Sequence, residues 1–256
     1  MKKHDLICGV MMVLLVAATH TVEGQDNSPE PAVDLKPTDK SLKILSGMTQ
    51  FIESTPAFSV KGNAGGELMM NNGQLIEYGT NVTATFLRPA KLYLRLNSRD
   101  GSKTTMVFDG ETITAATSIN DQHIYDTTPQ QGDVNDSLAL LSRESGGSRE
   151  LVYFLTEQMT KSLSTIQTVF SLGKSTIDGI LCDHLAMRSD TRDGQVWIER
   201  GDNPTPWRIL ITHREKPGMP RFWLQFDEWD FSPELSESTF KYTPPEGAVK
   251  FRYFSE

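Results

Sequence analysis

The run at positions 92–114, LYLRLNSRDGSKTTMVFDGETIT, decides the fold class of this chain. In its first part Leu92, Leu94 and Leu96 alternate with more polar residues, which is typical of a strand with one buried face. Two Asp-Gly pairs follow, and each marks a turn because glycine tolerates the positive φ that tight hairpins require. Strands joined by such short turns pair antiparallel. The run therefore predicts a β-meander.

Strand-like runs with the same period lie on both sides of this meander. Polar and apolar residues interleave through 57–70 and 74–89, and five further runs follow between 168 and 231, separated by turn-forming glycine and proline. Few of the links are long enough for a crossover to a parallel strand. The sequence therefore predicts an antiparallel sheet of about ten strands, which should curl strongly.

Three amphipathic helices interrupt this pattern, at 37–54, 133–142 and 149–164, and Asp133 is the expected N-cap of the second. They are too few to form a complete second layer, so we expect them on one face of the sheet, where they could fill its concave side. Their apolar stripes comprise Leu42, Leu45, Met48, Phe51 and Ile52 in the first helix, and Leu151, Phe154, Leu155 and Met159 in the third.

The first 24 residues have the pattern of a secretory signal peptide. Lys2 and Lys3 precede a run of 13 apolar residues, and small residues at Val22 and Gly24 favour cleavage before Gln25. A retained membrane anchor is the alternative, but 13 apolar residues are fewer than the roughly 20 that cross a bilayer. Cleavage would leave 256 − 24 = 232 residues.

We expect the remainder to form a flexible lead at 25–36 and a single domain at 37–256. No second apolar run reaches spanning length, so the sequence predicts no membrane crossing. The net charge of −8 argues against nucleic acid as a partner, because nucleic-acid binding rests on basic contacts to phosphate. The sequence contains no nucleophile elbow, zinc-protease or Walker motif, and we expect no cofactor.

Cys182 and His184, in the run ILCDHLAMR at 180–188, allow three interpretations. Residues two apart on a strand share a face, so the pair could bind zinc, but zinc wants further protein ligands, and His123 and His213 are distant in sequence. A histidine-activated thiol is the second interpretation. We favour the third, a buried apolar thiol beside a hydrogen-bonded histidine, and predict neither a metal site nor a catalytic residue.

Aromatic residues are dense in the C-terminal strands, where they belong either to an ordinary core or to the lining of an apolar cavity. A curved sheet that its few helices do not cover completely would leave such a cavity. The residues concerned are Trp197, Trp207, Phe222, Trp223, Phe226, Trp229 and Phe231.

Several segments resemble a bacterial family of predicted periplasmic proteins within the LolA-like superfamily of periplasmic lipoprotein carriers. They are LRPAKLYL at 87–94, FDGETIT at 108–114, GILCDHLAMR at 179–188 and GQVWIERGDNPTPWRILITHREKPGMP at 194–220. The resemblance extends over most of the chain, from about Thr38 to Phe251. These motifs are moderately specific for the family, but they indicate little about a chemical activity.

The resemblance implies an α+β fold, in which a curved antiparallel half-barrel sheet holds a few helices in its concave face. In carriers of this fold the cavity holds acyl chains and the helices act as a lid. No catalytic role comes with the Cys-His pair. Where the family tends to read Asp-Trp-Gln-x-Trp, this chain reads Asp-Gly-Gln-Val-Trp at 193–197, so the first tryptophan is absent.

We therefore expect an exported, soluble, non-enzymatic protein that binds a lipid, an acyl chain or a lipidated protein non-covalently in an apolar cavity, with a carrier role as one form of this function. An envelope membrane protein is a further expected partner, and the expected location is the periplasm. One alternative is an envelope scaffold whose own side chains fill its core, and another is an enzyme that uses Cys182 and His184. The expected cavity lining is Leu45, Met48, Phe51, Leu151, Phe154, Leu155 and Trp197.

Overall fold

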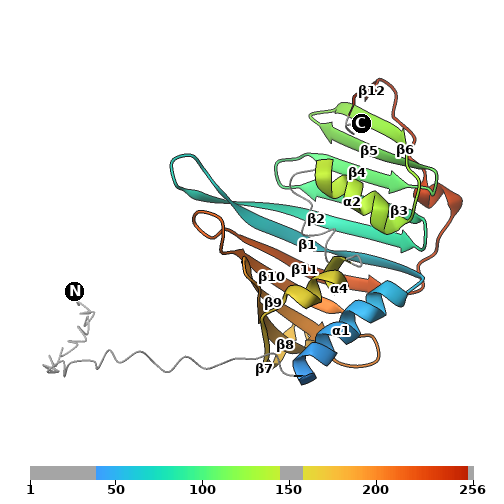
Figure 1. Cartoon of the computed structure of the whole chain (residues 1–256). Helices are drawn as coiled ribbons and strands as arrows, with labels where there is room; N and C mark the ends of the chain where they lie inside the picture. The colour runs from blue at the N-terminus through green and yellow to red at the C-terminus, as the bar shows by residue number, and fades with distance from the viewer. Residues whose placement is uncertain (1–38, 145–157, 253–256) are drawn as a thin grey trace, which may run out of the picture. The chain divides into compact units, whose positions relative to one another are not determined.

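Twelve strands form one sheet in the computed structural model, which describes residues 39–144 and 158–252 (Figure 1). The spatial order is β12-β6-β5-β4-β3-β2-β1-β11-β10-β9-β8-β7. Two meanders, β1 to β6 and β7 to β11, are therefore joined by the pairing of β1 with β11. The strands are β1 Ala57–Met69, β2 Leu75–Leu87, β3 Lys91–Ser98, β4 Lys103–Phe108, β5 Thr112–Ile119, β6 Gln122–Pro129, β7 Thr168–Ile177, β8 Ile180–Arg188, β9 Arg192–Glu199, β10 Pro206–His213, β11 Arg221–Asp230 and β12 Val249–Lys250.

The hairpin of β3 and β4 shows why the sequence folds this way locally. Gly101 adopts a φ of 88° in the turn, and Ser98 N–H donates to Ser102 O at 2.9 Å to close it. Gly110 likewise has a φ of 102° before β5. The two Asp-Gly turns predicted from the sequence are thus confirmed.

The helices are short and few in the described ranges. Their bounds are α1 Asp39–Ser54, α2 Val134–Glu144, α4 Gln158–Ser162, and the 3-10 turns η1 Leu163–Thr165 and η2 Glu237–Phe240. None of these helices combines the length and apolar character that a membrane-spanning helix requires.

The predicted helices match these elements in part. Asp133 caps α2 as expected, because its Oδ1 accepts hydrogen bonds from the backbone N–H groups of Asn135 at 2.7 Å and Asp136 at 3.1 Å. The third predicted helix is observed only as α4 and η1, since residues 145–157 lie outside the described ranges. The predicted signal peptide and the lead at 25–36 also lie outside them, and both stay predictions.

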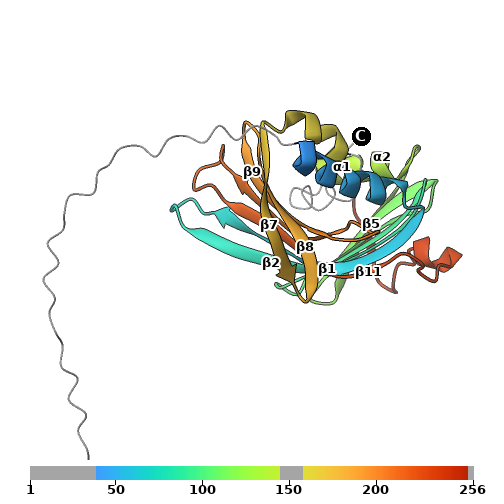
Figure 2. The same cartoon turned by 90° about the horizontal axis from the view of Figure 1, so that it is seen from below.

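The core lies between the helices and one face of the sheet. The sheet curves, and α1 and α2 lie on its concave side (Figure 2). Leu45, Met48 and Ile52 of α1 are buried in the same apolar cluster as alternate residues of the strands, such as Val196 and Ile209. The predicted class, an α+β fold with a curved antiparallel sheet and helices in its concave face, is confirmed. The exception in the described sheet is β12, which pairs parallel with β6 over two residues.

Candidate functional site

A pocket of about 70 Å³ lies on the concave side, where α1 and the α4–η1 segment approach β8, β9 and β10. The helical segments contribute Leu45, Ser162, Leu163, Thr165 and Ile166 to its lining, and the sheet with its β8–β9 turn contributes Met187, Arg188, Ser189, Arg192, Gly194 and Ile211.

Strand register brings together the three residues that form the centre of the sheet side of the pocket. Gly194 of β9 is the cross-strand partner of Met187 in β8 and of Ile211 in β10, so the three residues face the same side. A Cβ at Gly194 would lie 2.9 Å from Met187 Cγ and 3.8 Å from Ile211 Cδ1. The Met187 side chain therefore packs closely over Gly194, where any larger residue would force it to shift, and both residues line the pocket.

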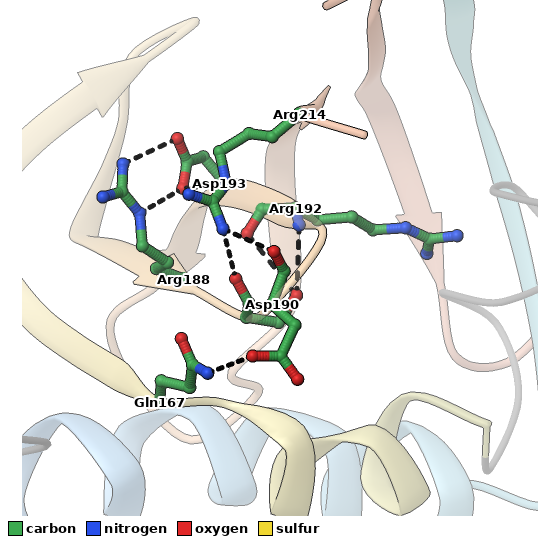
Figure 3. Close-up of polar contacts among 7 residues, drawn as sticks. Gln167, Arg188, Asp190, Arg192, Asp193 and Arg214 are labelled. Carbon is green, nitrogen blue, oxygen red and sulfur yellow. Dashed lines mark hydrogen bonds and ion pairs between the residues drawn. The ribbon is translucent and has the colours of Figure 1, made fainter. Parts of the chain in front are cut away.

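The rim of the pocket is a hydrogen-bonded network at the β8–β9 turn (Figure 3). Arg188 donates to both carboxylate oxygens of Asp193, at 2.6 and 2.9 Å. The Asp193 carboxylate raises the pKa of Arg188, through the hydrogen bond first and through its charge second. This two-pronged pair fixes the planes of both groups and makes the turn rigid.

A second arginine joins the turn to the neighbouring strand. Arg214 donates to the backbone oxygens of Ser189 at 2.8 Å and Asp190 at 2.6 Å. Gln167, which follows η1, donates to the Asp190 carboxylate. The network therefore connects the helical side of the pocket to the sheet side.

Arg192 differs from the other two arginines. It pairs with His213 across β9 and β10, and it lies two residues before Gly194, so it shares the concave face. Its guanidinium points away from the turn network in Figure 3. The pKa of Glu215 is lowered mainly by a hydrogen bond from its own backbone N–H, then by His213, and last by the charge of Arg192.

Of the three lining residues predicted from the first helix, only Leu45 is among the residues that line this pocket. Leu45 lines the pocket, and Met48 lies in the core one turn further along α1. Phe51 is half-buried and makes an edge-to-face contact with Phe231, with ring centroids 5.3 Å apart. The predicted lining residues Leu151, Phe154 and Leu155 lie outside the described side chains.

Trp197 lies on the other face of the sheet from these α1 residues, which corrects the expectation that it shares a cavity with them. Its neighbours in β9, Val196 and Ile198, are both core residues, so the Trp197 side chain points to the convex side. There it stacks on His184, with ring centroids 4.1 Å apart and planes at 15°. The Arg208 guanidinium lies 6.0 Å from the Trp197 centroid and 5.8 Å from that of Trp223.

Cys182 and His184 share the convex face but have separate contacts. The Cys182 thiol is fully buried and lies 3.6 Å from the backbone oxygen of Ile180. Burial first, and then the charges of Glu199 and Asp183, raise the pKa of Cys182 to about 11. The His184 Nε2 instead contacts Gln195 Oε1 at 3.0 Å. In the described ranges, no group of three or more histidine, cysteine or acidic side chains could hold a metal ion.

Sequence reasoning missed most of the pocket. Met187, Gly194 and Ile211 come together through the register of three strands, which no local pattern contains. Glycine inside a strand was the one available signal, because such a glycine often marks a position where another group approaches closely. Arg192 carries no signal that separates it from the neighbouring arginines.

A family model identifies the chain. The model for "Predicted periplasmic protein (DUF2092)" matches residues 41–252. The chain belongs to this family. The resemblance stated from the sequence is thereby confirmed, and the periplasmic location expected for the protein agrees with the description of the DUF2092 family. No curated protein matches the sequence.

Several solved structures are similar to this chain at low sequence identity. The Mycobacterium tuberculosis lipoprotein LppX is 15% identical with a TM-score of 0.44, and the match covers 77% of this chain and 99% of that one. An uncharacterized conserved protein from Thermus thermophilus is 11% identical with a TM-score of 0.45, covering 83% and 99%. A chain of the Pseudomonas aeruginosa MucA/MucB complex is 13% identical with a TM-score of 0.43, covering 80% and 61%.

Proposed function

We propose that this DUF2092 protein binds a hydrophobic ligand, namely a lipid, an acyl chain or a lipidated protein, non-covalently on the concave side of its sheet. The observation that supports the proposal is the pocket, because Leu45, Leu163 and Ile166 from the helical side line it together with Met187 and Ile211 from the sheet. Each methylene transferred into such a site contributes about 0.8 kcal/mol.

The size of the pocket limits what enters without rearrangement. Its volume of about 70 Å³ is far below the roughly 300–1,000 Å³ of typical small-molecule sites, so it accepts the end of one acyl chain. A whole chain requires the α4–η1 segment to move away from the sheet, which is the lid role that the resemblance implies. Transfer of such a ligand to an envelope membrane protein would make this protein a carrier.

The proposal assigns no catalytic function to the protein. A thiol nucleophile reacts as the thiolate, and the raised pKa of Cys182 keeps it protonated at neutral pH. Its neighbour His184 stacks on Trp197 and contacts Gln195 instead of activating the thiol. Cys182 and His184 are therefore proposed to stabilise the convex face.

The small pocket also favours a second candidate, an envelope scaffold that holds no ligand. In that case the apolar side chains of α1 and the sheet, such as Met48 and Phe226, fill the concave side by themselves. The two candidates make opposite predictions about bound lipid.

Native mass spectrometry of the full chain, exported to a bacterial periplasm and purified without detergent, separates them. We expect a stoichiometric lipid in the wild-type protein and its loss in Gly194→Leu, because the new side chain would force Met187 to shift into the pocket. An unchanged melting temperature shows that the variant is folded. Gly47→Leu is the matched control, since no atom lies within 4 Å of a Cβ at that position of α1. A clean apo mass after incubation with membrane lipids would refute the proposal and favour the scaffold.

A further inference from the structure

We propose that the ligand is an amphiphile with an anionic head group, and that Arg192 binds the head-group oxygens while the apolar end occupies the pocket. This inference rests on the proposed function and deepens it. The shared chemistry of the head group is a carboxylate or a phosphate, both of which match the planar fork of a guanidinium.

The chemistry of the lining changes along the pocket. Apolar residues form its helical and sheet walls, with Gly194 between them, and hydroxyl groups are contributed by Ser162, Thr165 and Ser189. Arg188 and Arg192 are the charged members of the lining, and none of the described lining residues is acidic. The Thr165 hydroxyl donates to Ser162 O at 2.8 Å and the Ser189 hydroxyl to Arg192 O at 3.5 Å, so the hydroxyl groups are engaged within the protein. A site with apolar walls and a guanidinium group is complementary to a molecule with an apolar end and an anionic end.

Because the turn network binds the other two arginines, Arg192 is the arginine available to a ligand. Arg188 is held by both oxygens of Asp193, and Arg214 is held by two backbone oxygens. Within the described ranges the Arg192 guanidinium forms no hydrogen bond, and its charge contributes to the lowered pKa of Glu215. The Glu215 carboxylate is already bound by its own backbone N–H and by His213, so it competes weakly for Arg192.

The position of Arg192 allows one ligand to contact both the apolar pocket and the guanidinium. On a strand, residues two apart lie about 7 Å from each other on one face, so Arg192 is one step from Gly194 towards the rim. An acyl end seated at Gly194 would therefore place its head group beside the Arg192 guanidinium. Arg188 also belongs to the lining, but its guanidinium is already bound by both carboxylate oxygens of Asp193.

Isothermal titration calorimetry of the full chain with four defined probes tests this inference. Dodecyl phosphate and dodecanoate carry an anionic head, dodecanol has the same chain and no charge, and inorganic phosphate has the charge and no chain. We expect Arg192→Gln to weaken the two anionic amphiphiles about tenfold or more, which is the range for a lost charge-assisted hydrogen bond. We expect less than about a twofold change for dodecanol, which makes no such bond.

Two further variants make the result specific. Arg192→Lys keeps the charge without the fork, and it should lie between wild type and Arg192→Gln. Arg95→Gln removes an exposed arginine from β3, far from the pocket-lining strands in the sheet order, and should bind every probe like the wild type. Equal melting temperatures of the three variants would show that binding, not folding, is measured.

The outcomes separate this inference from the proposed function. If no amphiphile binds, both fail. If dodecanol binds as tightly as the anionic amphiphiles, or if Arg192→Gln weakens all three equally, the apolar site stands and the head-group inference is overturned. Arg192-dependent binding of inorganic phosphate with the affinity of dodecyl phosphate would overturn it in favour of a free anion.

Discussion

The two faces of β8, β9 and β10 are built from adjacent residues of the same strands, yet they are stabilised in different ways. On the concave face Leu185, Val196 and Ile209 are paired in register and are almost completely buried. Removing their apolar surface from water is the main stabilising contribution there. This face needs the helices, because strands alone would leave its apolar row in water.

No helix of the described residues covers the opposite face of these three strands, which is stabilised by lateral contacts instead. A row of paired residues from the three strands runs across this face: His184, Trp197 and Arg208. The His184 ring stacks on the Trp197 ring, and the Arg208 guanidinium lies over the same tryptophan. The row continues to Gln225, whose Oε1 accepts a hydrogen bond from Arg208 at 2.6 Å. Flat side chains thus shield each other without a second layer. The difference teaches that an aromatic strand residue need not belong to the core or to the cavity.

The largest difference in stability between the two faces is expected when a charge is buried on the concave face. Val196→Asp would place a carboxylate among apolar side chains without a partner, and we expect a loss of at least about 4 kcal/mol in the free energy of unfolding. Gln195→Glu, one residue away on the convex face, also introduces a carboxylate but keeps the Oε1 that His184 contacts, and it should cost no more than about 1 kcal/mol. Urea unfolding followed by circular dichroism measures both. Equal losses would contradict the proposed difference between the faces.

Shortening one side chain on each face compares how much the two faces contribute to stability. Leu185→Ala leaves a cavity in the concave core and should cost about 2–5 kcal/mol. His184→Ala, its neighbour in β8, loses one ring stack and one hydrogen bond, which together contribute about 1–3 kcal/mol. The midpoints of urea unfolding give the two free-energy losses, provided that the dependence of the unfolding free energy on urea concentration has the same slope in each variant. A larger loss for His184→Ala would mean that the lateral row, not the core, dominates this region.

Much of the fold could be predicted from the sequence, because its signals are local. The helical spacing of Leu45 and Met48 predicted both a helix and its buried face, and the Asp-Gly pairs predicted hairpins. Asp133 could be predicted as a cap from its type and its position before an apolar stripe. Antiparallel order followed from the short links between strands.

The site could be predicted only in part, because it depends on faces and registers. Alternation divides β9 into two sets, but it does not say which set faces the helices when one contains Val196 and Ile198 and the other contains Trp197. An error of one residue exchanges the sets. The contact of Gly194 with Met187 and Ile211 depends on two strand pairings, so no pattern within β9 predicted it.

Cys182 offers a pH-dependent test of the convex face, where it is unusual in being fully buried. Its pKa rises from 9.0 to about 11 on folding, mainly because burial disfavours the thiolate. The folded protein therefore keeps a proton that the unfolded chain releases, so this stabilisation is complete below about pH 9 and is lost towards pH 11. Cys182→Ala should lower stability at neutral pH, and its difference from wild type should shrink across that window.

The Cys182→Ala variant also serves as a control for ligand binding. Because the thiol lies on the face opposite the pocket, Cys182→Ala should leave lipid binding unchanged in native mass spectrometry. Loss of binding at retained stability would instead connect the two faces. A difference from wild type that stays constant from pH 8 to pH 11 would show that the thiol has no raised pKa.

The smallest effect is expected for an exposed ion pair on the convex face. Lys61 and Glu228 form an ion pair at 2.9 Å across β1 and β11, and both side chains are 54% exposed. Such pairs contribute about 0–1 kcal/mol and are screened by salt. Lys61→Gln should therefore shift the urea midpoint slightly at low ionic strength and not at high ionic strength. A loss as large as that of Leu185→Ala would mean that exposed polar pairs, and not only the stacked row, stabilise the uncovered face of the sheet.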